Sequence, residues 1–282
     1  MIRSPASRMI LLFAAASIAA VLAGAPIMAG AGLGSGWTRN CAAWLIGAIM
    51  AGVLLASGRR PGVVAALPLL AVIALAATLL AAPVDGVHRW VDAGPLHVNM
   101  AALLLPPAVV ALSLRRTGSR LSMSVAALIA LLLILQPDAS QASAFAVAIA
   151  VVILRSGLEA RVSYAALLFP VAAAVAAWLR PDAVQPVPEV EQIFSIGWTV
   201  SAPLALLGAL ALAAASLSPL VARTRDESAR TAALALTGYF AIAALAPFFG
   251  AFPVPLVGLG MSFPVGYWLA IGLLSANLRT RP

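Results

Sequence analysis

The chain has 282 residues, of which 63% are hydrophobic and 9% are charged, and its formal net charge is +8. Soluble domains typically carry about a quarter charged residues, so the composition excludes a soluble globular protein and predicts that the lipid bilayer surrounds most of the chain. The positive charge does not indicate a nucleic-acid partner, because the arginines lie in short segments between apolar runs. Cys41 is the one cysteine, which rules out an internal disulfide.

Long apolar runs predict an all-α integral membrane protein with about ten transmembrane helices in one polytopic domain, residues 1–282. Unbroken stretches of Ala, Leu and Val favour helices over a β-barrel, whose strands of about ten residues alternate in polarity. Arg3 and Arg8 precede a first run that is longer than the apolar core of a signal peptide, so we expect an uncleaved first span. The expected spans are residues 9–31, 41–57, 63–83, 98–114, 121–136, 139–154, 162–179, 196–220, 230–249 and 254–277.

The arginines predict the orientation of these spans. With both the N- and C-terminus in the cytoplasm, only Arg39, Arg89 and Arg180 fall on the outer side, as the positive-inside rule requires. The rule also requires a turn at residues 136–138, because one merged helix would place two arginine clusters on opposite sides. The arginines expected on the inner side are Arg3, Arg8, Arg59, Arg60, Arg115, Arg116, Arg120, Arg155, Arg161, Arg223, Arg225, Arg230, Arg279 and Arg281.

The first outer loop with functional potential covers residues 86–96 and carries Arg89 next to Trp90. A tryptophan at the end of a span is often only an interfacial anchor. A guanidinium, however, can hold a phosphate through two parallel hydrogen bonds. We therefore weigh an anionic lipid headgroup as the ligand of Arg89 against a purely anchoring role for both residues.

Two further outer segments, residues 136–140 and 253–262, combine prolines with polar or small residues. Asp138 follows Pro137 at the expected start of a helix, where the helix dipole favours an acid, so capping alone would explain it. The prolines and glycines of residues 253–262 predict a broken helix or close packing, since non-helical backbone at membrane depth must be buried or line a cavity.

Residues 180–192 form the longest outer loop and carry three carboxylates: Asp182, Glu189 and Glu191. Three prolines stiffen this loop into extended segments. Such a loop could hold a general base or a divalent cation, or it could simply be solvated. The two histidines, His88 and His97, are too few for a metal site, which usually needs three or four ligands.

Taken in order, these segments resemble the SEDS family (shape, elongation, division and sporulation), the FtsW/RodA type of membrane protein. The family's first outer loop reads roughly G-x-x-R-W-[IV]-x-x-G, its next motif is Q-P-D, its large loop carries P-E and an acid before I-F, and its last loop contains P, G and S. The matching residues are Gly86, Arg89, Trp90, Val91 and Gly94, then Gln136, Pro137 and Asp138, then Pro188, Glu189, Glu191, Ile193 and Phe194, then Pro255, Gly260 and Ser262.

The resemblance implies a ten-span protein of the inner (cytoplasmic) membrane that polymerises a lipid-linked glycan precursor, usually with a penicillin-binding transpeptidase as partner. It implies Glu191 as the catalytic base, with Glu189 as its neighbour, and Arg89, Trp90, Asp138 and Ser262 as substrate-binding residues. The sequence identifies no cofactor, and a divalent cation could take part. The chain departs from the family after the first motif, where Asn99-Met100-Ala101-Ala102 replaces a segment that carries Glu and Lys.

Two other functions stay open. The missing Glu and Lys favour a non-catalytic scaffold that recruits envelope proteins. A flippase or transporter for a lipid-linked substrate is the third reading, but transporters usually place ionisable residues near the middle of their spans. The expected spans contain no clear charge there.

Overall fold

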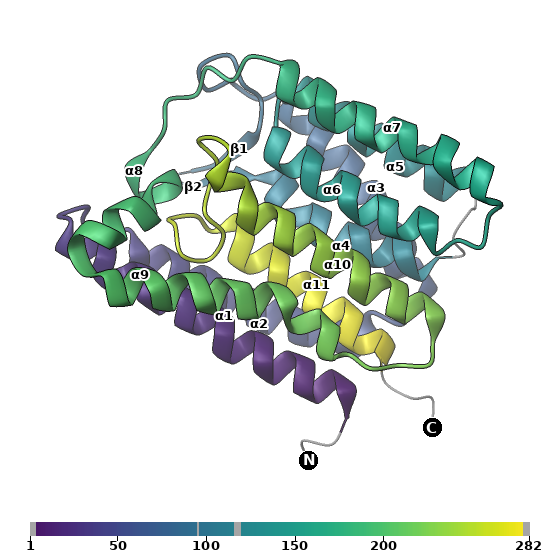
Figure 1. Cartoon of the computed structure of the whole chain (residues 1–282), viewed down its shortest axis with the longest axis horizontal. Coiled ribbons are helices and arrows are strands. Elements are labelled where there is room, and N and C mark those ends of the chain that lie inside the picture. The colour runs from purple at the N-terminus through teal and green to yellow at the C-terminus, as the bar shows by residue number, and fades with distance from the viewer. Residues whose placement is uncertain (1–3, 95, 116–119, 279–282) are drawn as a thin grey trace.

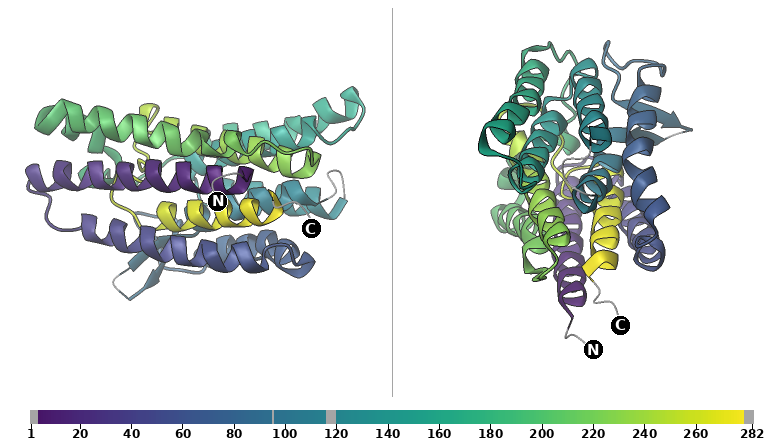
Figure 2. Two further views of the ribbon diagram at one scale, coloured as in Figure 1. Left: turned by 90° about the horizontal axis from the view of Figure 1, so that it is seen from below. Right: turned by 90° about the vertical axis from the view of Figure 1, so that its right-hand side faces the viewer.

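The protein is described by a computed structural model that covers residues 4–94, 96–115 and 120–278. Helices run side by side along the long axis of the molecule (Figure 1, Figure 2). Among the described residues, six helices are long and apolar enough to cross a membrane, and four further apolar helices are shorter than 18 residues. The chain is therefore a multi-pass membrane protein, whereas the count of ten spans stays a prediction.

The helices are α1 (Pro5–Gly30), α2 (Trp37–Ser57), α3 (Pro61–Thr78), α4 (Met100–Leu114), α5 (Arg120–Leu135), α6 (Ala139–Leu154), α7 (Ala160–Leu179), α8 (Pro188–Glu191), α9 (Ile193–Leu217), α10 (Glu227–Leu245) and α11 (Ser262–Leu278), with two 3-10 helices, η1 (Ser218–Val221) and η2 (Ala246–Phe248).

The first helix begins and the last helix ends at the same end of the bundle, and α8 lies at the opposite end (Figure 1). This arrangement agrees with both termini on one side of the membrane, but which side that is remains a prediction. Four arginines expected on the inner side, Arg3, Arg116, Arg279 and Arg281, lie outside the described residues.

Helices α4 and α11 form the centre of the bundle. Twelve of the 15 residues of α4 and 15 of the 17 residues of α11 are buried. A helix that is apolar all round is buried among its neighbours. In contrast, α2, α3 and α7 bury only four residues each and expose Leu, Ile and Val side chains, as lipid-facing helices do.

Glycines let the central helix approach its neighbours closely. A Cβ atom on Gly266 would collide with the Ala102 carbonyl of α4, and one on Gly272 would lie 2.6 Å from the Ala51 carbonyl oxygen of α2. Small residues at helix interfaces allow this close backbone contact in membranes. Helix α11 therefore packs closely against both α2 and α4.

A two-stranded hairpin corrects the all-α prediction. Strand β1 (Trp90–Ala93) pairs antiparallel with β2 (Leu96–Asn99), and the hairpin projects from one side of the bundle (Figure 2). Gly94 adopts φ 62° in the turn, a conformation that glycine tolerates without steric cost. The span predicted at 98–114 therefore begins at Met100, because the two residues before it belong to the strand.

The last predicted span, 254–277, is wrong in its first turns. Residues 249–261 are non-helical, and α11 begins at Ser262. Pro253 and Pro255 lack the N–H that a helix interior requires, and the glycines that follow weaken a helix further. The expectation of a broken helix in this segment agrees with the structure.

Other boundaries differ by a few residues. The helix predicted at 63–83 ends at Thr78 in the structure. Four helices begin three or four residues before the predicted start of the first, second, eighth and ninth spans, at Pro5, Trp37, Ile193 and Glu227. The required turn is present, because α5 ends at Leu135 and α6 begins at Ala139.

Candidate functional site

Two adjoining pockets open at the end of the bundle that carries the hairpin and α8. The smaller has a volume of about 20 Å³, which is room for one water molecule. The larger is a mainly apolar groove of about 360 Å³, a size typical of small-ligand sites. The residues that line both are Trp90, Asn99, Val184, Glu191, Pro253 and Phe263.

Arg89 forms one wall of the small pocket and is only 5% exposed. Its Nη2 donates hydrogen bonds to the Pro137 carbonyl and, at 2.6 Å, to Asp182 Oδ2. Its Nε lies 3.9 Å from Asp138 Oδ2 and has no hydrogen-bond partner among the described residues. The guanidinium thus connects two segments that are far apart in sequence, and its buried Nε–H group has no hydrogen-bond partner among the described residues.

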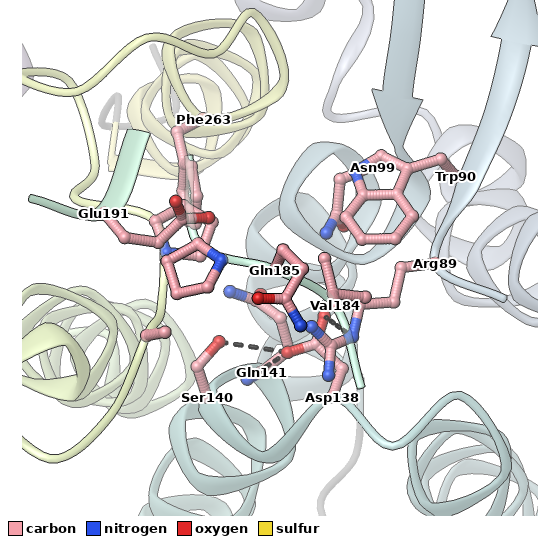
Figure 3. Close-up of a pocket in the computed structure, with 13 residues that line it drawn as sticks. Arg89, Trp90, Asn99, Asp138, Ser140, Gln141, Val184, Gln185, Glu191 and Phe263 are labelled. Carbon is pink, nitrogen blue, oxygen red and sulfur yellow. Dashed lines mark hydrogen bonds and ion pairs between the residues drawn. The ribbon is translucent and has the colours of Figure 1, made fainter. Parts of the chain in front are cut away.

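Asp138 is buried beside Arg89 at the start of α6. Its Oδ1 accepts hydrogen bonds from the Gln141 backbone N–H at 3.2 Å and from the Ser140 hydroxyl at 3.0 Å (Figure 3). This is helix capping, the simpler of the two roles considered for Asp138. Gln141 in turn accepts a hydrogen bond from the Tyr239 hydroxyl, which anchors this corner of the site in α10.

Gln136, on the other side of the turn, is completely buried. Its side-chain amide donates to the Leu75 carbonyl at 3.0 Å and to the Thr78 hydroxyl. Gln136 therefore fastens the Q-P-D segment to α3, and Asp138 caps α6 at the other end of the segment. Together they fix the position of the Pro137 carbonyl, which Arg89 binds.

The loop of residues 180–192 crosses over the site and is held at both ends. Asp182 binds Arg89 at one end. At the other end the Leu259 N–H donates to the Glu189 carbonyl at 2.7 Å, and the Val254 N–H donates to the Val190 carbonyl at 3.0 Å. The loop therefore depends on the buried arginine and on the non-helical segment before α11.

That segment is positioned by Asn40 of α2, which is 1% exposed. The Asn40 amide donates to the Gly258 carbonyl at 2.7 Å and its oxygen accepts from the Gly260 N–H at 2.9 Å. A Cβ atom on Gly258 would collide with the Val190 carbonyl, so only glycine allows α8 to lie this close. Close approach of backbones is a common reason for glycine.

Glu191 lies where the small pocket meets the groove, across the small pocket from Arg89 (Figure 3). Burial raises the pKa of its carboxyl group from the ordinary 4.5 to about 7, although the Val187 N–H, which donates to Oε2 at 2.6 Å, lowers it. A carboxyl group that titrates near neutral pH can accept and return a proton under physiological conditions.

The groove carries a cation of its own, Arg39 at the start of α2. Its side chain is exposed and makes no hydrogen bond or ion pair with the described residues. Ser262 also lines the groove, and its hydroxyl accepts a hydrogen bond from the Asn99 N–H at 2.9 Å. The groove thus offers an apolar floor, a free guanidinium and a carboxyl group.

Most residues singled out in the sequence come together here. Arg89, Trp90, Asp138 and Glu191 line the small pocket, and Trp90, Glu191 and Ser262 line the groove. Glu189 is absent from the described lining of both pockets. The described residues contain no cluster of His, Cys, Asp and Glu able to hold a metal ion.

Sequence reasoning missed Asn40, Asn99 and Arg39. Asn40 and Asn99 act through hydrogen bonds to or from the backbone of distant segments, and no local sequence motif indicates such bonds. Arg39 did give a signal, because it is one of only three arginines on the expected outer side.

Solved structures share this fold. Thermus thermophilus rod shape determining protein RodA superposes with a TM-score of 0.65 and 22% identity, over 96% of this chain and 95% of that one. An aspartate-to-alanine mutant of the same protein gives a TM-score of 0.66. A chain from a structure described as the coordination of polymerization and crosslinking by a peptidoglycan synthase complex gives 0.67 at 21% identity, over 96% of each chain. The fold is RodA-like. No family model and no curated protein sequence matches the chain.

Proposed function

We propose that the protein is a membrane glycosyltransferase of the inner (cytoplasmic) membrane that polymerises sugars linked to undecaprenyl diphosphate into peptidoglycan-type glycan strands. The RodA-like fold, the ordered motifs and the two adjoining pockets support this proposal. The observation that carries it is Glu191, a carboxyl group with a pKa of about 7 at the junction of the pockets.

Glu191 acts as the general base. Forming a glycosidic bond requires removal of a proton from the acceptor hydroxyl, and a base contributes most when its pKa lies near the working pH. The proton moves to the Glu191 carboxylate as the acceptor oxygen attacks the anomeric carbon. Glu189 is the less suitable carboxylate, because its backbone is fixed against Leu259 and its side chain lines neither pocket among the described residues.

The leaving diphosphate needs a cation to stabilise its developing charge. Arg39 supplies it, since its guanidinium is free in the groove and can grip phosphate oxygens in pairs. Arg89 instead orients Asp138 and Asp182, because its Nη2 is already bonded to protein groups and its Nε lies beside Asp138. Trp90 and Ser262 shape the groove around the substrate.

The test is polymerisation of lipid II by the purified protein. Glu191→Gln keeps an oxygen that can accept from the Val187 N–H, so the loop stays in place. Loss of a general base costs about 10²–10⁴-fold in rate. Glu189→Gln is the matched control, two residues away on the same short helix, and should retain at least about half of the activity. Full activity in Glu191→Gln would exclude Glu191 as the base.

A second candidate function is a non-catalytic scaffold that binds a penicillin-binding transpeptidase or another envelope protein. The observation in its favour is the volume of the small pocket, about 20 Å³, which is too small for a sugar as it stands. A wild-type protein that is inactive on lipid II, alone and with a co-purified transpeptidase, would favour this function.

Transport is the weaker alternative. Among the described residues of the six long helices and the four shorter apolar helices, every charged side chain belongs to the first four residues of its helix, as with Arg8, Arg39 and Arg161. Ion-coupled transporters usually carry charges near the bilayer midplane. The helix interiors described here offer none.

A further inference from the structure

A separate cavity of about 310 Å³ lies at the end of the bundle opposite the candidate site. It is formed by η1, the segment that follows it, and the first turns of α10. Two arginines and a hydroxyl form its polar side: Arg223, Arg230 and Thr224. Leu220, Ala233 and Leu234 belong to its apolar side.

The described lining of this cavity contains no carboxylate, so its charge is positive. The Arg223 side chain makes no hydrogen bond or ion pair with the described residues. Arg230 lies 3.5 Å from Glu227, but the other oxygen of Glu227 already binds Arg155 at 2.5 Å. One guanidinium is therefore unpaired and the other is only partly neutralised.

An apolar ridge leads along α9 to this cavity. Leu206, Leu210 and Leu217 repeat at helical spacing on one face of α9, and they are 50%, 61% and 49% exposed. Leu220, which lines the cavity, continues the ridge and is 48% exposed. A ligand bound by the arginines could thus lay an apolar chain along the surface of the bundle.

We propose that this cavity binds one anionic phospholipid, with the phosphate between Arg223 and Arg230 and an acyl chain along the α9 ridge. Basic pockets at the membrane surface bind anionic headgroups in this manner. A free phosphate would leave the apolar side and the ridge unused, which is why the lipid is the better occupant. The site is independent of the proposed polymerase function.

The test measures lipid binding to the purified protein in detergent micelles by native mass spectrometry. The probes are phosphatidylglycerol, phosphatidylcholine and glycerophosphoglycerol, the last being the same headgroup without acyl chains. Removing one basic contact near a membrane surface weakens binding about fivefold, so Arg223→Gln should weaken phosphatidylglycerol binding by about that factor. Arg225→Gln removes the same charge two residues away, outside the described lining of the cavity, and should bind as the wild type does.

Three outcomes would overturn the proposal. Equal effects of Arg223→Gln and Arg225→Gln would show a general charge effect. Equal binding of phosphatidylcholine would show that the headgroup charge is irrelevant. Equal binding of glycerophosphoglycerol would assign the cavity to a free phosphate ester and remove the role of the α9 ridge. A thermal unfolding scan of each variant without added lipid checks that its fold is retained.

Discussion

The ion pair between Arg89 and Asp182 should hold the loop of residues 180–192 over the site. The change Asp182→Asn keeps the shape of the side chain and removes its charge. Arg89 is 6% exposed at its side chain and Asp182 is 30% exposed, with 2.6 Å between Nη2 and Oδ2. The Pro137 carbonyl and Asp138 remain near the guanidinium, so the positive charge of Arg89 is still partly balanced in the variant.

The magnitude follows from burial. A hydrogen bond to a charged group contributes about 1.5–3 kcal/mol, and screening at the exposed part of Asp182 reduces this to about 1–2 kcal/mol. For a chain of this size, ~1 kcal/mol corresponds to a change of about 2–4 °C in Tm. Asp182→Asn should therefore lower the Tm by about 2–8 °C.

The assay is thermal unfolding in detergent, followed by tryptophan fluorescence. The matched control is Asp92→Asn in the hairpin, where Asp92 also lies 2.6 Å from a partner, His97, but both side chains are more than half exposed. An exposed pair contributes about 0–1 kcal/mol, so the control should shift the Tm by less than half as much. Equal shifts in the two variants would refute the argument from burial.

Three further outcomes are expected. Polymerisation should rise with pH through about 7, because a base with a raised pKa is protonated below that value, and a flat profile between pH 6 and 8 would contradict the role of Glu191. Gly258→Ala should displace α8 and abolish polymerisation, whereas Gly260→Ala should leave α8 in place and the Tm unchanged, since nothing lies within 4 Å of its added Cβ. A reporter fused after Arg60 should read cytoplasmic and one fused within residues 182–189 external, and the reverse pattern would invert the predicted topology.

The sequence predicted the helices well where apolar runs are long, because burial in lipid leaves the backbone few alternatives. It predicted the break at residues 136–138 from charge alone. The hairpin at residues 90–99 was missed, since its strands are four residues long and depend on one turn at Gly94. A run that short carries too little periodicity to be distinguished from the start of the next helix.

The site was predictable only in part. Motif residues such as Arg89 and Glu191 could be named, but their environments could not. The expectation that Arg89 grips a phosphate did not anticipate that Asp182, 93 positions later in the chain, would occupy its Nη2. The anchoring of Gly258 by Asn40 spans 218 positions, and such a contact exists only once the bundle is assembled.

The place of α11 in the bundle has a consequence for biogenesis. It is made after all the other described helices, yet it packs between α2 and α4, which are made much earlier. Until α11 packs, those two helices lack the helix between them, and the preceding segment that supports α8 is not yet held in place by α11. Contacts between residues so far apart in sequence form late and slowly. A nascent or truncated chain that lacks α11 would therefore sit in the membrane without a formed site.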